Sequence, residues 1–324
     1  MLERVLMKHI FFVIALALIF VNVAAAKTYC VDDDGSDCPT ADFVKIQDAV
    51  DAASSGDEIL VYPGVYFEDV VLNKRLTLRG VDSPEINGER EGIRIQAAGC
   101  WVEGFRINFC ELAGLSVESE DNVIIRNIIE HNKYGIKLQR ASKNIIRENK
   151  LMNNDYGLYL HESSENFIYL NDIIGNVDSV YSYKSQNWWH SQGRVSYVYN
   201  GKTFENYLAN YWSDHKHVDL DGDGICDYVY LIDGEDEDYF PLIMPFENYE
   251  ILRTPEVMPS PAAGTQDATT TGAGDGSGGA PAPTPTRTPA ADGALLIFGF
   301  VSTLLMLKEK QRRRATEETR SLFD

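Results

Sequence analysis

The chain has 324 residues, of which 44% are hydrophobic and 24% are charged, and its formal net charge at pH 7 is −20. Acidic residues are spread over the whole central part of the chain, which excludes nucleic acid and anionic lipid headgroups as partners of that part. A charge of this sign fits solubility or the binding of divalent cations.

Residues 1–26 have the features of a secretory signal peptide. Basic Arg4 and Lys8 precede an apolar core over residues 10–20, and three alanines follow at 24–26. We therefore expect the protein to be exported, with Lys27 as the first residue of the exported chain.

The five cysteines of an exported chain suggest some disulfide bonding. Cys30 and Cys38 enclose a short acidic loop and form the best candidate pair. Cys100 and Cys110 fall at two different positions of the repeat described below, so we expect buried thiols there. Cys226 has no evident partner.

A short helix is predicted to cap the N-terminal end of the repeats. Phe43, Ile46, Val50 and Ala53 follow one another at helical spacing. Stacked repeats need a cover for their open ends, and the apolar face of this helix can plug the first one.

The middle of the chain repeats every 22 residues. Glycines at 92, 114, 135 and 157 each precede a stretch in which apolar and polar residues alternate, which predicts short strands with one buried face. A fixed period of roughly 20 to 50 residues predicts a stacked repeat. Three sets of asparagines keep the interval: Asn122, Asn144 and Asn166; Asn127, Asn149 and Asn171; Asn132, Asn154 and Asn176.

The predicted fold is all-β, a right-handed parallel β-helix over residues 27–212 with about 22 residues per coil. At tight corners asparagine tolerates left-handed backbone angles, and its amide can bond to the coils on both sides. Each asparagine set is therefore predicted to form a structural ladder. A leucine-rich repeat is the rival solenoid, but its leucine spacing is missing.

The N-terminal part of this region resembles a known superfamily. Ile46-Gln-Asp-Ala-Val50, Pro63-Gly64 and Leu76-Thr-Leu-Arg-Gly80 look like the opening of pectin-lyase-like β-helices. With the Asn-x-Ile-Ile repeats, the chain is similar to the NosD-like family, also described as carbohydrate-binding and sugar-hydrolysis (CASH) domains, and to its archaeal surface proteins. This resemblance implies either carbohydrate binding or a role in supplying copper.

Aromatic residues crowd between residues 181 and 212, and two interpretations compete. They can cover the open C-terminal end of the solenoid, or they can stack on sugar rings with their flat faces. The candidates for carbohydrate binding are Trp188, Trp189, Tyr197, Tyr199 and Trp212.

An acidic C-terminal cap is predicted over residues 213–251, with a loop that resembles a calcium site. Asp219, Asp221, Asp223 and Asp227 occupy positions 1, 3, 5 and 9 of a calcium loop, and the carbonyl of Ile225 is available at position 7. The alternative is a solvated acidic turn. A bound cation would stabilise the cap because it binds the folded state alone.

Copper is a second metal to consider, because imidazoles are suitable Cu(II) ligands. His215 and His217 are separated by one residue, and His190 precedes them. The alternative is that these histidines are simply solvated.

Catalysis has less support in the sequence. A polysaccharide lyase, hydrolase or epimerase needs convergent carboxylates and, in a lyase, a basic residue. The acids of neighbouring coils, among them Glu130, Glu148 and Glu162, do not form a column at the 22-residue interval. No residue is therefore named as catalytic.

The C-terminal quarter is predicted to attach the protein to the cell surface. Residues 252–292 have the composition of a disordered stalk, residues 293–307 form a hydrophobic membrane or sorting segment, and residues 308–324 a basic cytoplasmic tail. The expected function is binding or envelope structure, with carbohydrate as the leading ligand. The alternatives are cleavage or epimerisation of a polysaccharide and handling of copper.

Overall fold

The computed structural model describes residues 26–233 and 236–253. The predicted signal peptide up to residue 25, the stalk from residue 254, the hydrophobic segment and the basic tail lie outside the described residues. Within the described part, no helix has the length and the apolar character needed to cross a membrane.

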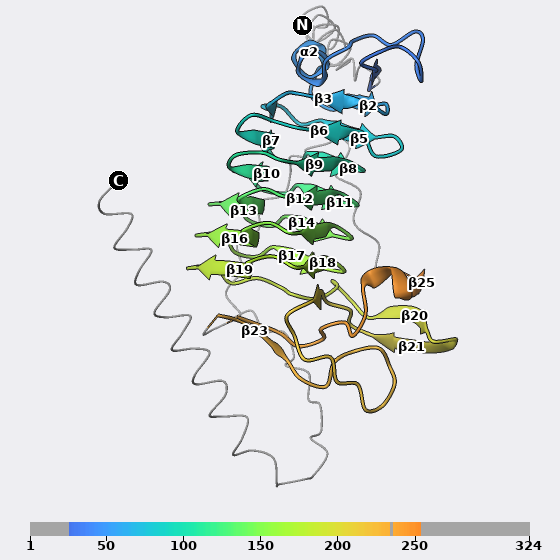
Figure 1. The fold of residues 1–324 in the computed structure, drawn as a ribbon, viewed down its shortest axis with the longest axis vertical. Coiled ribbons are helices and arrows are strands. Elements are labelled where there is room, and N and C mark those ends of the chain that lie inside the picture. The colour runs from blue at the N-terminus through green and yellow to red at the C-terminus, as the bar shows by residue number, and fades with distance from the viewer. Residues whose placement is uncertain (1–25, 234–235, 254–324) are drawn as a thin grey trace, which may run out of the picture. The chain divides into compact units, whose positions relative to one another are not determined.

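Three parallel sheets stack coil upon coil into a solenoid (Figure 1). We call the three sheets A, B and C. Each coil contributes one strand to each sheet, and the chain passes from sheet C to sheet A and then to sheet B. Sheet A contains β1 (Thr28–Val31), β2 (Glu58–Val61), β5 (Thr77–Gly80), β8 (Trp101–Glu103), β11 (Val123–Ile125), β14 (Ile145–Arg147) and β17 (Phe167–Tyr169). Sheet B contains β3 (Val65–Tyr66), β6 (Glu85–Ile86), β9 (Arg106–Asn108), β12 (Ile128–Glu130), β15 (Lys150–Met152), β18 (Asp172–Ile174) and β22 (Tyr211–Trp212). Sheet C contains β4 (Val70–Leu72), β7 (Glu91–Ile95), β10 (Ala113–Val117), β13 (Tyr134–Gln139), β16 (Tyr156–His161) and β19 (Asp178–Tyr183).

The core of the solenoid follows from the alternation seen in the sequence. In sheet C, Leu115 pairs with Ile136 and Ile136 with Leu158, and all three side chains are fully buried. The residue that follows each of them in its strand points to the outer face, because successive side chains of a strand point to opposite faces. The predicted parallel β-solenoid with about 22 residues per coil is confirmed.

The asparagine ladders are present as predicted. The backbone N–H of Asn122 donates to Oδ1 of Asn144 at 2.9 Å, and the backbone N–H of Asn144 donates to Oδ1 of Asn166 at 2.9 Å. The set that contains Asn149 and the set that contains Asn154 repeat this pattern. These bonds satisfy buried backbone donors at every corner, where a sheet ladder cannot.

The N-terminal cap contains the predicted helix, α2 (Ile46–Ala52). Lys45 at its N-cap makes no capping bond with its side chain. Instead, the carboxylate of Glu68 accepts the backbone amides of Ile46 and Gln47, at 2.9 and 3.0 Å. A residue more than 20 positions away therefore replaces the usual local cap.

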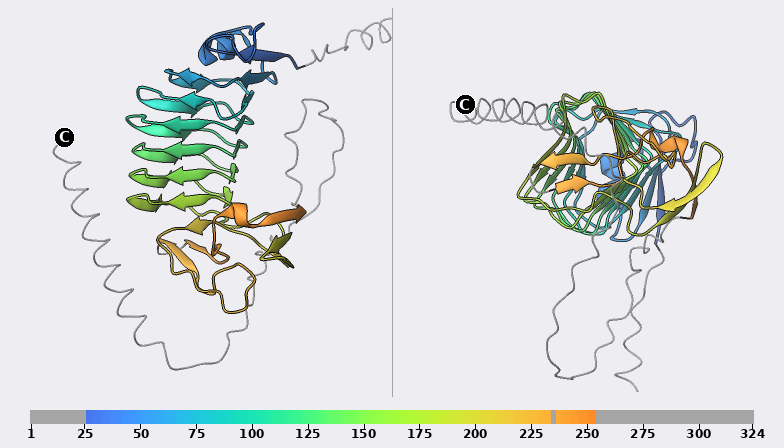
Figure 2. Two further views of the ribbon diagram at one scale, coloured as in Figure 1. Left: turned by 45° about the vertical axis from the view of Figure 1, so that its right-hand side comes forward. Right: turned by 90° about the horizontal axis from the view of Figure 1, so that it is seen from below.

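A C-terminal cap covers the other end of the solenoid (Figure 2). It consists of an antiparallel sheet, β20 (Val195–Tyr199), β21 (Lys202–Asn206) and β25 (Glu250–Arg253), a hairpin, β23 (Tyr230–Asp233) and β24 (Asp236–Asp238), and a short 3-10 helix, η1 (Phe246–Asn248). β20 and β21 precede β22, the last strand of sheet B. The chain therefore forms two cap strands before it returns to the solenoid at β22.

Candidate functional site

Four tyrosines meet on the outer face of sheet C, and we call this group the tyrosine platform. It consists of Tyr134, Tyr156, Tyr159 and Tyr181. The ring centroids of Tyr134 and Tyr159 lie 4.6 Å apart, and those of Tyr159 and Tyr181 lie 4.8 Å apart with nearly parallel planes. Tyr156 contacts the other three rings at 5.5 to 6.3 Å.

The strand register explains why these rings come together. Tyr134 pairs with Tyr156, and Tyr159 pairs with Tyr181, in neighbouring strands of sheet C. All four are half-buried, whereas the intervening core positions are fully buried. The coils thus stack aromatic side chains on the outside of sheet C, where they stay partly exposed.

Polar and charged groups border the tyrosine platform. The ammonium of Lys133 lies 5.3 Å from the centre of the Tyr134 ring. Lys137 occupies the outward position of β13 beside Tyr159. The imidazole of His161 packs against Tyr183, with ring centroids 5.2 Å apart. Partly exposed aromatic rings with such a border can stack on an apolar face and bond to hydroxyl groups.

The aromatic residues predicted to bind carbohydrate lie elsewhere, and four of the five are buried. Trp189, Trp212, Tyr197 and Tyr199 are at most 8% exposed, so their faces cannot stack on a sugar. That part of the prediction is wrong, because Trp189 and Trp212 join the core of the solenoid and Tyr197 and Tyr199 form the core of the C-terminal cap. Trp188 is 42% exposed and stacks on Phe167.

Two of these tryptophans mark the ends of asparagine ladders. The amide of Asn187, which continues the first ladder, donates to Oδ2 of Asp236, and so does the indole of Trp189. The second ladder ends at Asp238, whose Oδ2 accepts the amide of Asn210 and the indole of Trp212. The hairpin β23–β24 therefore supplies the last acceptor of both ladders.

The predicted calcium loop brings its first three carboxylates together. Carboxylate oxygens of Asp219, Asp221 and Asp223 all lie within 4.8 Å of one another. Oδ1 and Oδ2 of Asp219 accept the amides of Gly222 and Gly224, at 2.7 and 2.9 Å, which fixes the turn. The other predicted ligands are the carbonyl of Ile225, which lies in a fully buried residue, and Asp227, whose Oδ2 accepts the amide of Leu220.

Tyrosines of the cap hold the backbone of this loop. The hydroxyl of Tyr197 donates to the carbonyl of Asp223 at 2.8 Å, and that of Tyr249 donates to the carbonyl of Gly224. Gly224 has φ +88°, and a Cβ there would lie 2.8 Å from the rings of Tyr199 and Tyr249. The loop is thus fixed against the cap core.

The three histidines predicted to bind copper do not form one site. His215 and His217 are neighbours, with ring centroids 6.2 Å apart, while His190 packs against Tyr207 and Phe240. In residues 26–233 and 236–253, the groups that bring three ligand atoms within 4.8 Å are both acidic: Asp32, Asp33 and Asp34, and the calcium-like loop. The described histidines therefore do not fit a three-ligand copper centre.

Burial lowers the pKa of two of the predicted copper histidines. In His190 it outweighs the hydrogen bond between Nδ1 and the carbonyl of Ser191, which raises the pKa. It also lowers the pKa of His215, whose Nε2 contacts the carbonyl of Tyr228 at 2.9 Å. Both rings are engaged in packing and in bonds to the backbone.

Acids on the outer faces are neutralised by arginines. Glu130 pairs with Arg106, and Glu148 with Arg126 and Arg147. Glu162 pairs with Arg140, whose hydrogen bond is the main cause of a lowered pKa of this carboxyl. These three carboxylates are held in ion pairs along the corners.

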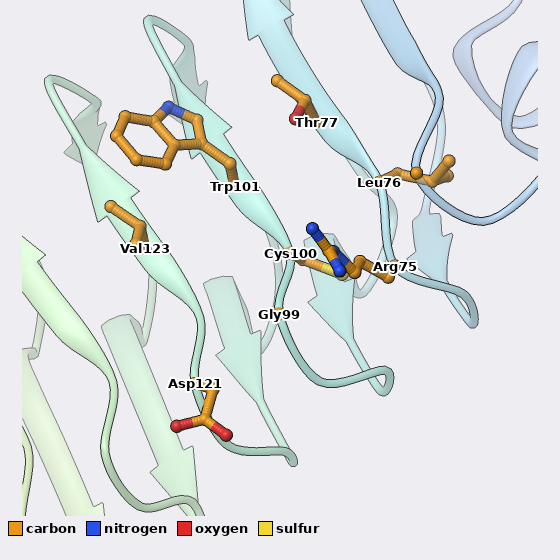
Figure 3. Close-up of a pocket in the computed structure, with 9 residues that line it drawn as sticks. Arg75, Leu76, Thr77, Gly99, Cys100, Trp101, Asp121 and Val123 are labelled. Atoms are coloured by element: carbon orange, nitrogen blue, oxygen red, sulfur yellow. The ribbon is translucent and has the colours of Figure 1, made fainter. Parts of the chain in front are cut away.

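A small hollow lies on the outer face of sheet A (Figure 3). Its volume is about 80 Å³, and Trp101 and Val123 stand side by side along it, with Arg75 and Asp121 at the adjoining corner.

The comparisons with known proteins agree with the fold and with the resemblance seen in the sequence. The chain is 44% identical over 70 residues to a cell surface glycoprotein of the archaeon Methanothermus fervidus. The aligned part is 20% of this chain and 12% of that protein, so the chain spans only a small share of this relative. The family model described as "Periplasmic copper-binding protein (NosD)" matches residues 50–217, which is 168 of 324 residues. The protein belongs to the NosD family.

Proposed function

We propose that this member of the NosD family is an exported surface protein that binds carbohydrate through the tyrosine platform on sheet C. The surface location is supported by the similarity to a cell surface glycoprotein and by the family's periplasmic description. The ligand is proposed from the chemistry of the platform itself.

The observation that carries the proposal is the contact of four half-buried tyrosine rings on an outward sheet face. Rings that only stabilised the fold would be covered, as those of Trp189 and Trp212 are. Phenol faces stack on the C–H faces of pyranose rings, and their hydroxyls exchange hydrogen bonds with sugar hydroxyls. Lys137 and His161 border the rings and can add further bonds.

The test is a glycan array probed with the full-length protein and with the double variant Tyr159→Ala/Tyr181→Ala. Removal of two stacking faces should weaken binding about tenfold or more, since each 1.4 kcal/mol changes the affinity tenfold. The variant should remain folded, because both rings lie outside the core. Trp188→Ala is the matched control, as it removes an exposed aromatic side chain on another part of the surface.

The proposal fails if the double variant binds the same glycans as strongly as the wild type. Loss of binding in Trp188→Ala alone would move the site to the C-terminal cap.

We further propose that Ca²⁺ binds the loop of Asp219, Asp221 and Asp223 and stabilises the C-terminal cap. The three carboxylates converge, and Tyr197 and Tyr249 hold the loop backbone in place. Ca²⁺ prefers such oxygen ligands. At a concentration 100 times its Kd, the ion would stabilise the fold by about 2.7 kcal/mol.

Thermal unfolding with CaCl₂ and with EDTA tests the calcium proposal. Asp221→Asn removes one negative charge and should abolish most of the calcium-dependent shift in Tm. Asp33→Asn, in the N-terminal acidic group, should leave that shift unchanged. A shift of equal size in Asp221→Asn would refute calcium binding at this loop.

Copper is named in the description of the family, but we propose no copper chemistry for this chain. His190 does not come together with His215 and His217, so the described residues offer no three-histidine centre.

A further inference from the structure

We propose that Cys30 and Cys38 are a site of oxidative modification, at which thiol–disulfide exchange closes a covalent loop over the N-terminal cap. All five cysteines are thiols in this structure. The inference is independent of carbohydrate binding, because it concerns the opposite end of the solenoid from the C-terminal cap and does not involve sheet C.

The backbone brings the two cysteines close together. The carbonyl of Cys30 accepts the amide of Asp42 at 2.9 Å, and the carbonyl of Cys38 accepts the amide of Ala41 at 2.9 Å, so two adjacent residues tie both cysteines to one place. Burial, followed by the neighbouring Cys38 side chain, raises the pKa of the Cys30 thiol. Both cysteines are half-buried, so a small oxidant can reach them. Joining the two sulfurs therefore requires no approach of distant segments of the chain.

The backbone on each side of the pair is fixed. Cys30 belongs to β1 and pairs with Leu60 of β2, and its amide donates to Oδ2 of Asp42 at 3.0 Å. The amide of Cys38 donates to Oδ2 of Asp32, and its carbonyl accepts the amide of Ala41 at 2.9 Å. The two cysteines are thus held near each other by their own backbones.

Asp32 organises the loop between the cysteines. This buried carboxylate also accepts the amides of Asp34, Gly35 and Asp37, at 3.0 to 3.3 Å. These bonds to the charged form lower the pKa of Asp32, with the bond from Cys38 as the largest cause. The loop therefore has a defined shape before any covalent bond forms.

The chemistry needs a low-molecular-weight disulfide as oxidant. The thiolate of one cysteine of the pair attacks one sulfur of this disulfide, whose S–S bond breaks, and one thiolate leaves and takes up a proton. The other cysteine then loses its proton and attacks the Sγ that carries the mixed disulfide, which releases the second thiol. Two protein thiols are oxidised and one external disulfide is reduced to two thiols.

The other three cysteines should remain thiols. Cys100, Cys110 and Cys226 are at most 3% exposed. Burial raises the pKa of Cys110 to about 11, which suppresses its thiolate.

Peptide mapping of the full-length protein tests the assignment. The reduced protein is incubated with oxidised glutathione, denatured, alkylated and digested without reductant. The expected product is a Cys30–Cys38 peptide that is lighter by two hydrogens and resists alkylation, while the other three cysteines are alkylated. Alkylation of both Cys30 and Cys38, or a bond from either one to another cysteine, would overturn the proposal.

Single variants test the two-step exchange and allow for altered folding. Cys30→Ser should accumulate a stable mixed disulfide with glutathione on Cys38, and Cys38→Ser should accumulate one on Cys30, because the resolving thiol is missing. Absence of a mixed disulfide in both variants would refute the exchange, and hydrogen exchange of the β1 amides would show whether each variant keeps its cap.

Discussion

Asp172 shows how burial makes the stability of this fold depend on pH. Its side chain is 1% exposed, Oδ1 accepts the amide of Phe246, and Oδ2 has no hydrogen-bond partner. Burial is the main cause that raises the pKa of this carboxyl to about 7, and Glu247 raises it further. The bond from Phe246 and the charge of Lys150 oppose this rise.

We predict that the free energy of unfolding decreases as pH rises from about 4 to about 7 through Asp172. The unfolded carboxyl has a pKa near 3.9, so in this window the folded state binds more protons than the unfolded state. The effect is about 4 kcal/mol at most. Asp172→Asn keeps the acceptor for Phe246 and should flatten the slope, which urea unfolding at several pH values would measure. An unchanged slope would show that Asp172 does not titrate in this window.

The members of the tyrosine platform could have been found from the repeat. Tyr134 and Tyr156 are 22 residues apart, and so are Tyr159 and Tyr181. The sequence interpretation grouped Tyr181 with the aromatics that follow it, but in a solenoid the neighbours in space are one coil away. For Tyr159 and Tyr181, the 22-residue interval between two outward positions was therefore the missing signal.

At the scale of elements, the solenoid was predictable because each strand depends on local alternation and on one fixed interval. The cap strands β20, β21 and β25 were not, because β25 comes from a segment more than 40 residues beyond β21. Burial of Trp189 and Trp212 likewise depends on Asp236 and Asp238. No local pattern encodes that contact.

The second asparagine ladder connects the coils, and its central member is the best place to test it. Asn149 accepts the amide of Asn127, and its Nδ2 donates to Asn171 and to the carbonyl of Ile124. We predict that Asn149→Ala destabilises the fold by about 2 to 4 kcal/mol, because several buried polar groups lose their partners.

Urea unfolding checks the effect of Asn149→Ala. Asn153→Gly is the control: this exposed corner residue has φ +53°, which glycine adopts readily, so we expect a change of about 0.5 kcal/mol or less. Equal losses in the two variants would contradict a role of the ladder in stability.

At the scale of the whole molecule, the hairpin β23–β24 closes the C-terminal end of the solenoid. Tyr230 stacks on Trp212 with ring centroids 4.1 Å apart, and Ile232 belongs to the buried core. Asp238 is fully buried and accepts three N–H groups, from Asn210, Trp212 and Phe240. The hairpin thus covers apolar surface and ends two ladders at once.

Asp238→Asn should therefore lower the free energy of unfolding, whereas Asp172→Asn should not. Burial nevertheless raises the pKa of both carboxyls to about 7. An asparagine side chain has one acceptor oxygen, so its NH₂ group must take the place of Oδ1 or of Oδ2. In the place of Oδ2 it faces the amide of Asn210 and the indole of Trp212, and in the place of Oδ1 it faces the amide of Phe240. Unpaired buried donors cost about 1 to 3 kcal/mol each. We predict a loss of about 2 kcal/mol or more in urea unfolding, and faster hydrogen exchange over residues 230–238 while the coils from β7 to β13 stay protected. Equal stability of the two asparagine variants would mean that the hairpin does not close the solenoid through Asp238.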